Sequence, residues 1–192
     1  SGSVWTVLGD PTEGALLALA GKGGFHASKL NYNCDRVAEI PFTSERKRMS
    51  VVIRPCKDGT CPVNESVMFT KGSPELVLER CQSVQTAQGV EPLTPTMREQ
   101  ILAHNDEMAS HGLRVLGFAM KPLTQPVGND DLEAEEASLT WLGLVGMLDA
   151  PRPEVRAAVK ACRRAGIRPV MITGDHQLTA QAIATDLGIA QS

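Results

Sequence analysis

The stretch Val67–Glu75 constrains the fold more than any other, because it passes from a strand to a helix through one glycine. Val67–Phe69 has the β-branched and aromatic composition of a strand. Ser73–Glu75 is typical of a helix start, with a capping serine, a proline at the first helical position and a carboxylate in the first turn. The local backbone therefore places Lys71 and Gly72 where the strand ends and the helix begins.

A lysine in this position has two interpretations. The first N–H groups of a helix lack partners inside the helix, so a lysine beside them makes a positive corner that suits a phosphate. Alternatively, the ammonium of Lys71 is only solvated. The stretch alone leaves both interpretations open, and the other residues of the chain have to decide between them.

The composition describes an ordinary globular protein. The 192 residues are 42% hydrophobic and 21% charged, with a formal net charge of −3. This length allows one large domain, or one domain with a piece of another. The charge balance argues against a nucleic-acid partner and against binding to a membrane surface, and no apolar run approaches the roughly 18 residues of a membrane span.

The five cysteines and four histidines predict neither a disulfide framework nor a metal site. An odd number of scattered thiols is typical of a reducing compartment. Cys56 and Cys61 bracket four residues of hairpin-turn composition, and a zinc site there would need further ligands. We therefore expect strand-end cysteines and no bound metal.

The first expected element is a helix from Pro11 to about Gly21, capped by Asp10. Glu13 lies three residues after the cap. Its carboxylate either closes a capping arrangement or takes part in binding, and the sequence around it favours the first interpretation.

A β-hairpin is expected next, with strands at Arg36–Ile40 and Met49–Ile53. The turn between them carries Glu45–Arg48, which is either a solvated charge cluster protecting a sheet edge or part of a binding site. In the second case Phe42 would offer its ring to a base, and Lys47 would meet a polar edge or a phosphate. A core position for Phe42 is the competing possibility.

Composition and turn residues predict the elements that follow. They are a short helix from Pro74 to Cys81, polar turns over 82–91, a helix from Thr94 to about Gly112, a strand over 113–120, a mobile acidic loop over 121–138 and a strand over 139–148. Arg114 is the charged residue of an apolar strand, and it is either an edge charge or a phosphate ligand.

The composition changes at Asp149–Pro153, where two prolines around Arg152 predict a stiff, extended hinge. We divide the chain there into domains of residues 1–148 and 149–192. The second part has an α/β pattern, with a helix over 153–165, a buried strand over 168–172 and a helix ending near Leu187. Thr173–Asp175 joins the last two, and it forms either an anion-facing nest or a plain helix cap.

Six segments, in chain order, now carry a family resemblance. They are Gly9–Leu16 (GDPTEGAL), Phe42 with Glu45–Val51 (ERKRMSV), Phe69–Glu75 (FTKGSPE), Gly112–Leu116 (GLRVL), Gly146–Asp149 (GMLD) and Met171–Asp175 (MITGD). In this order they resemble the P-type cation-transporting ATPases, over nearly the whole chain. The resemblance is strongest to the type II branch, the calcium-pump-like enzymes, and the short loops suggest a bacterial member.

The resemblance implies an α+β fold, in which a twisted, mainly antiparallel sheet flanked by helices forms a nucleotide-binding domain. A partial Rossmann-like segment of the haloacid-dehalogenase type would follow. The implied ligand is ATP. Matching positions imply a base pocket in which Phe42 stacks on adenine and Glu13 and Lys47 form the lining. They imply that Lys71 and Gly72 lie deep in this pocket and that Arg114 and Leu116 approach the ribose and phosphates. In the second part, they imply that Asp149 and Arg152 form the hinge and that Thr173, Gly174 and Asp175 meet the γ-phosphate.

The resemblance also implies functions that other parts of a longer protein would supply. No Asp-Lys-Thr-Gly-Thr occurs in the chain, so the phosphoryl-accepting aspartate, the ligation of Mg²⁺ and the membrane helices would lie elsewhere. We therefore expect ATP binding without turnover, in the cytoplasmic domain of an inner or plasma membrane protein. Its partners would be the remaining phosphorylation, actuator and transmembrane domains.

One consequence and two alternatives remain. Without those other parts, the strand expected at 168–172 would expose an open sheet edge, so we expect this piece to be mobile, to repack or to pair with a second copy of the chain. A haloacid-dehalogenase-type phosphatase would need an aspartate nucleophile after an earlier strand, which residues 1–140 do not offer. A stand-alone nucleotide-sensing or interaction module would use the same Phe42–Lys71 pocket without a pump.

Overall fold

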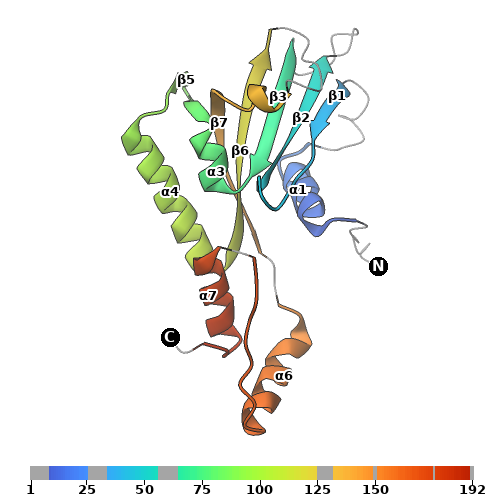
Figure 1. Cartoon of the computed structure of the whole chain (residues 1–192), viewed down its shortest axis with the longest axis vertical. Coiled ribbons are helices and arrows are strands. Elements are labelled where there is room, and N and C mark those ends of the chain that lie inside the picture. Colours follow the sequence, from blue (N-terminus) through green and yellow to red (C-terminus); the bar gives the residue numbers. More distant parts are fainter. Residues whose placement is uncertain are drawn as a thin grey trace.

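A computed structural model describes residues 9–25, 34–55, 65–124, 132–148, 151–174 and 176–190 of the chain. Its centre is a seven-stranded sheet (Figure 1), whose spatial order is β1-β2-β3-β6-β7-β4-β5. The strands are β1 (Cys34–Ile40), β2 (Arg48–Pro55), β3 (Ser66–Gly72), β4 (Cys81–Thr86), β5 (Gly89–Pro92), β6 (Leu113–Leu123) and β7 (Leu139–Leu148). All neighbouring strands run antiparallel except β4 and β7. The expected mainly antiparallel α+β sheet is confirmed.

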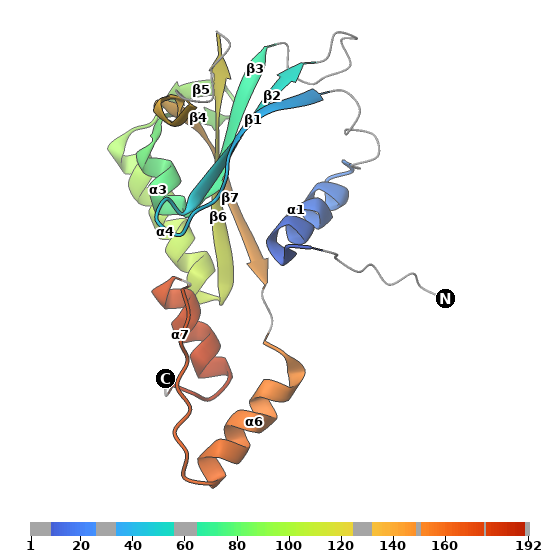
Figure 2. The same cartoon turned by 45° about the vertical axis from the view of Figure 1, so that its right-hand side comes forward.

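Helices cover the two faces of the sheet unequally. On one face lie α3 (Pro74–Glu79), α4 (Pro95–Ser110) and the single turn α5 (Leu132–Glu135), and on the other lies α1 (Pro11–Lys22), as Figure 2 shows. Both buried clusters lie on the face with α3, α4 and α5. One contains Val77, Leu78, Cys81, Leu93, Ala119, Leu139 and Trp141, and the other contains Ile40, Val52, Met68, Leu123 and Leu132. Among the described residues, α1 is the one helix over the second face, which we call the open face.

The helix starts that local signals predicted are confirmed. Four helices, α1, α3, α4 and α6 (Pro153–Arg164), carry proline in the first turn, where the missing N–H costs no hydrogen bond. Asp10 accepts from the N–H of Thr12 at 2.7 Å, and Thr94 accepts from that of Met97 at 3.2 Å. Ser73 differs, because its hydroxyl donates to Glu75 at 2.5 Å instead of capping α3.

The expectation of polar turns over 82–91 is wrong. These residues form most of β4 and β5, which pair through Ser83–Thr86 opposite Gly89–Pro92. The strand β5 is at the edge of the sheet, and only β4 contacts a second neighbour, β7. A polar edge strand resembles a loop in composition, because one of its sides has no apolar surface to bury.

The expectation of a mobile loop over 121–138 is also wrong for the described part. The strand β6 continues to Leu123, and α5 brings Leu132 into the second buried cluster. The side chain of Glu136 is fully buried. Residues 125–131 lie outside the described residues.

The C-terminal part contains α6 and α7 (Gln177–Asp186), with residues 167–174 between them. The strand expected at 168–172 is wrong: these residues have no regular secondary structure, and Ile172 is 94% exposed. A lone strand cannot satisfy its backbone N–H and C=O groups, and no strand of the described sheet lies beside this segment. Dimerisation of the chain stays a prediction, but the open strand edge on which it was based does not form.

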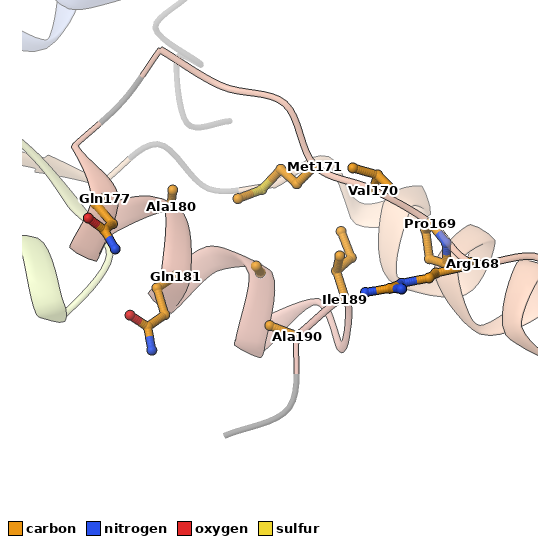
Figure 3. A pocket seen from close by; sticks show the side chains of 10 residues that line it. Arg168, Pro169, Val170, Met171, Gln177, Ala180, Gln181, Ile189 and Ala190 are labelled. Carbon is orange, nitrogen blue, oxygen red and sulfur yellow. The ribbon is translucent and has the colours of Figure 1, made fainter.

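Helix α7 packs on α4 near the start of β6. The hydroxyl of Thr179 donates to the carbonyl of Leu113 at 2.9 Å, and Gly112 lies beside Ala182 and Ile183. A shallow cavity of about 510 Å³ separates α7 from the segment 168–171, as Figure 3 shows. None of its lining residues was expected to bind nucleotide. Among the helices in the described ranges, none has the length and hydrophobicity that crossing a membrane requires.

Candidate functional site

The candidate site begins with a row of residues across three neighbouring strands. Lys71 on β3 pairs in register with Met49 on β2 and with Phe118 on β6. Side chains directly opposite one another share a face of the sheet. The face is the open one, because the ammonium of Lys71 forms an ion pair with the carboxylate of Glu13 on α1. Glu13 therefore forms an ion pair with Lys71 in addition to lying in the first turn of its helix.

Arg114 and Leu116 lie on the same face as Lys71. Both belong to β6 and are separated from Phe118 by even numbers of residues, which places them on its side of the strand. All three side chains are partly buried. The open face thus combines apolar and aromatic surface with the cations Lys71 and Arg114. That combination suits a ligand with a flat ring and an anionic tail.

The turn between β1 and β2 holds Lys47 against the end of β3. The N–H of Lys47 donates to the carbonyl of Thr43 at 2.8 Å, and the N–H of Ser73 donates to the carbonyl of Lys47 at 2.9 Å. Lys47 has a φ of 49°, in the left-handed region that a non-glycine residue rarely adopts. Gly72 lies so close that a Cβ there would be 2.4 Å from the Lys47 carbonyl oxygen. The backbone of Lys47 therefore lies against Gly72, the residue that follows Lys71.

Phe42 lies at the start of this turn and is 58% exposed. This exposure excludes the core position that was its competing interpretation. Because the turn ends at Lys47, beside Gly72, Phe42 lies at the same end of the sheet as Lys71. The ring is therefore exposed to solvent at this end of the sheet.

Beneath this turn lies a buried ionic network that the sequence analysis did not predict. The carboxylate of Glu136 accepts hydrogen bonds from Arg46 at 2.5 Å, from Arg48 at 2.8 Å and from the Ser50 hydroxyl at 2.6 Å. Burial alone would raise the pKa of Glu136, but these hydrogen bonds outweigh it and hold the pKa below its usual value. One signal was present: two arginines, Arg46 and Arg48, lie two residues apart at the start of an apolar strand, and buried cations require a carboxylate.

The predicted C-terminal residues are not brought into this row. Arg152 is exposed at the start of α6, and Thr173 and Gly174 are exposed in the segment that leads to α7. In Figures 1 and 2 this segment runs beside α7, beyond the end of the sheet. Asp149 and Asp175 lie outside the described residues.

The described residues do not supply a metal site. No group of three or more His, Cys, Asp or Glu side chains in those ranges could hold an ion. Carboxylate oxygens, the ligands that Mg²⁺ prefers, are occupied here by lysine and arginine partners at Glu13 and Glu136.

Comparison with known proteins decides the family. A family model described as P-type ATPase, cytoplasmic domain N, matches residues 1–154. The chain belongs to this family. The N domain defined by that match contains the whole seven-stranded sheet, the Lys71 row and the turn with Phe42.

Several bacterial proteins are similar over nearly the whole chain. The cation-transporting ATPase pma1 of Synechocystis is 44% identical over 98% of the chain, and the calcium-transporting ATPase 1 of Lactococcus lactis is 39% identical over 95%. The calcium-transporting ATPase of Bacillus subtilis is 40% identical over 93%. The chain covers only 19–20% of the length of these relatives. The P-type ATPase membership expected from the motifs is confirmed.

Proposed function

We propose that this N domain binds ATP on the open face of its sheet and presents it to a phosphoryl-accepting aspartate elsewhere in a P-type cation-transporting ATPase. The observation that carries the proposal is the position of Lys71. Its ammonium extends from the end of β3 over the open face, with Arg114 and Leu116 on the same side and the exposed ring of Phe42 at the same end.

The chemistry of these residues fits the two ends of a nucleotide. The Phe42 ring can stack on adenine, an interaction that is worth about 1–3 kcal/mol per base. Lys47 and Glu13 offer a cation and a carboxylate to the polar edge of the base. Arg114 carries positive charge toward ribose and phosphates, and Leu116 adds apolar contact. Because phosphoryl transfer depends mainly on positioning and charge neutralisation, a domain that orients ATP contributes directly to it.

Binding without turnover is the second part of the proposal. The chain contains no Asp-Lys-Thr-Gly-Thr segment and covers about a fifth of its relatives. We propose that residues 149–192 form the hinge and the start of a haloacid-dehalogenase-like phosphorylation domain, in which Thr173, Gly174 and Asp175 meet the γ-phosphate. The other domains would supply the acceptor, the ligation of Mg²⁺ and a membrane path for a cation such as calcium. The N domain would lie on the cytoplasmic side.

A thermal-unfolding titration with ATP tests this function. ATP at about 100 times its dissociation constant should stabilise the wild-type chain by about 2.7 kcal/mol. Lys71→Ala should lose most of that stabilisation, whereas the control Lys121→Ala should keep it. Lys121 pairs in register with the buried Met68 and binds Glu135, so it lies on the other face.

The outcomes separate the parts of the proposal. If the wild-type chain is not stabilised by ATP, nucleotide binding is excluded. If Lys71→Ala responds as strongly as wild type, the site lies elsewhere on the chain. Release of phosphate from ATP and Mg²⁺ above the level of a Lys71→Ala sample would contradict binding without turnover.

A further inference from the structure

The buried carboxylate of Glu136 lies on the opposite side of the sheet from the proposed nucleotide, yet it is connected to the turn that carries Phe42. Arg46 provides the connection. One of its guanidinium nitrogens, Nη2, donates to Glu136 at 2.5 Å, and the other, Nη1, donates to the carbonyl of Pro41 at 3.0 Å. Pro41 directly precedes Phe42, so a single planar group joins the carboxylate to the backbone of the stacking residue.

Arg48 makes the second connection. Its Nε donates to the other carboxylate oxygen of Glu136 at 2.8 Å, and its Nη1 donates to the carbonyl of Arg46 at 3.4 Å. The backbone of Arg48 lies against Gly72 at the end of β3. Glu136 therefore holds both ends of the turn, at Pro41 through Arg46 and at the start of β2 through Arg48.

The turn between β1 and β2 needs these hydrogen bonds because its backbone conformation is unfavourable in isolation. Lys47 has a positive φ, and a strained residue of this kind persists only where its surroundings over-determine it. Phe42 is mostly exposed and has little packing of its own to fix it. The positions of both side chains thus depend on the backbone hydrogen bonds of the turn and on the network beneath it.

We propose that Glu136 is a positioning residue for nucleotide binding, which sets the Phe42–Lys47 turn through Arg46 and Arg48 without touching the ligand. The inference rests on the proposed function, since it concerns the base side of the same site. It assigns a role to the described residues between α5 and β7, on the face of the sheet opposite the proposed nucleotide. The lowered pKa of Glu136 agrees with a carboxylate that stays charged at neutral pH.

The first arm of the test requires no ligand. Amide hydrogen exchange is measured in wild type, Glu136→Gln and the control Glu135→Gln, whose carboxylate binds Lys121 instead of the turn. In Glu136→Gln we expect the amides of Lys47 and Ser73 to exchange about tenfold faster relative to those in the middle of α4, which report any loss of global stability. Glu135→Gln should exchange as wild type does. Unchanged exchange at Lys47 and Ser73 in Glu136→Gln would overturn the proposal.

The second arm is a double-mutant cycle with ATP as ligand. Glu136→Gln should weaken binding by about tenfold in the wild-type background and have little effect in the Phe42→Ala background, because it acts through Phe42. Equal losses in both backgrounds would overturn the positioning role. If the wild-type chain binds no ATP, the proposed function fails, and the exchange arm still decides whether Glu136 sets the turn.

A second variant covers the case in which Glu136→Gln does not fold. Arg46→Lys keeps a positive charge beside Glu136, but one ammonium cannot reproduce the fork that reaches both the carboxylate and Pro41. Faster exchange at Lys47 and a loss of ATP affinity that disappears in the Phe42→Ala background would support the proposal. Wild-type exchange and affinity in Arg46→Lys would contradict it.

Discussion

Gly72 lies directly against the backbone of Lys47: a Cβ at Gly72 would come within 2.4 Å of the Lys47 carbonyl oxygen and 2.6 Å of Arg48 Cα. Both contacts are with backbone atoms, which cannot turn aside as the end of a side chain can. The glycine between the strand and the helix is therefore required by this close approach. It lets the turn with Phe42 pack on the end of β3, next to Lys71.

The first prediction is that Gly72→Ala lowers the free energy of unfolding by about 1–3 kcal/mol, since the methyl group has to push the Lys47 backbone away. Urea denaturation measures this loss. The control is Gly21→Ala near the end of α1, where a Cβ would meet nothing within 4 Å and alanine favours the helix. Gly21→Ala should be neutral or slightly stabilising. Equal free energies of unfolding for Gly72→Ala and Gly21→Ala would contradict the prediction, because they would show that the Lys47 backbone can move away from a methyl group without cost.

The second prediction concerns the acid side of the stability profile. The pKa of Glu136 in the folded chain lies below its ordinary value of 4.5, because hydrogen bonds from Arg46, Ser50 and Arg48 outweigh its burial. Its contribution to stability is therefore fully present above pH 4.5 and is lost as the pH falls through the lower, folded pKa. Glu136→Gln should cost about 3–5 kcal/mol near neutral pH, because it leaves two arginines without their anion.

The measurement is urea unfolding of wild type and Glu136→Gln between pH 7 and pH 3. The gap between the two free energies of unfolding should narrow as the pH falls below 4.5, because the unfolded wild-type chain then binds a proton at Glu136 more readily than the folded chain does. Glu133→Gln is the control, because its carboxylate also lies 3.4 Å from Nε of Arg46 but is 70% exposed, and an exposed pair of this kind contributes less than about 1 kcal/mol. A gap that stays constant over the whole range would contradict the pKa direction.

The third prediction concerns two thiols. Burial raises the pKa of Cys81 to about 12, and its thiol donates to the Val77 carbonyl at 3.2 Å. At pH 8 only about one in 10⁴ of such thiols is ionised, and only the thiolate is nucleophilic. Iodoacetamide should therefore modify the partly exposed Cys162 long before Cys81, as followed by peptide mass spectrometry. In guanidinium the two rates should become similar. Similar rates in the native chain would mean that the α3–β4 core opens easily.

Much of the fold could be predicted from the sequence where the cause is local. The helix starts at Pro11, Pro74, Pro95 and Pro153 are fixed by proline and its neighbours, and the structure confirms each one. The hairpin of β1 and β2 and the strand before Lys71 follow from residue alternation and composition. The motifs also predicted the family, which a match over most of the chain confirms.

The errors lie where long-range pairing decides. The strand β4 exists because β7, more than fifty residues later in the chain, lies beside it, and nothing in the local composition of Cys81–Thr86 reveals that neighbour. The apolar residues at 168–172 have strand composition but no neighbouring strand in the described sheet, so no strand forms. Glu136 was one of five carboxylates in the segment 121–138, and its local sequence does not distinguish it from the others. Its burial depends on Arg46 and Arg48, about ninety residues earlier.

The fourth prediction separates aromatic stacking from simple burial at Phe42. Phe42→Leu should weaken ATP binding by about 1–3 kcal/mol, because it keeps apolar surface but removes the ring, whereas Phe42→Trp should bind as wild type does. Isothermal titration with ATP measures both. Phe25→Leu is the matched control, since Phe25 is another exposed phenylalanine, at 60% against 58%, and follows α1 instead of the turn.

Inorganic tripolyphosphate separates the two ends of the ligand. Tripolyphosphate has no base, so its affinity should be the same for wild type and Phe42→Leu. A lower affinity for tripolyphosphate in Lys71→Ala would show that the Lys71 ammonium also attracts the phosphates. A Phe42→Leu variant that binds ATP as tightly as wild type would exclude stacking. Equal weakening of ATP and tripolyphosphate by Phe42→Leu would show that the substitution disturbs the turn as a whole instead of removing contact with the base.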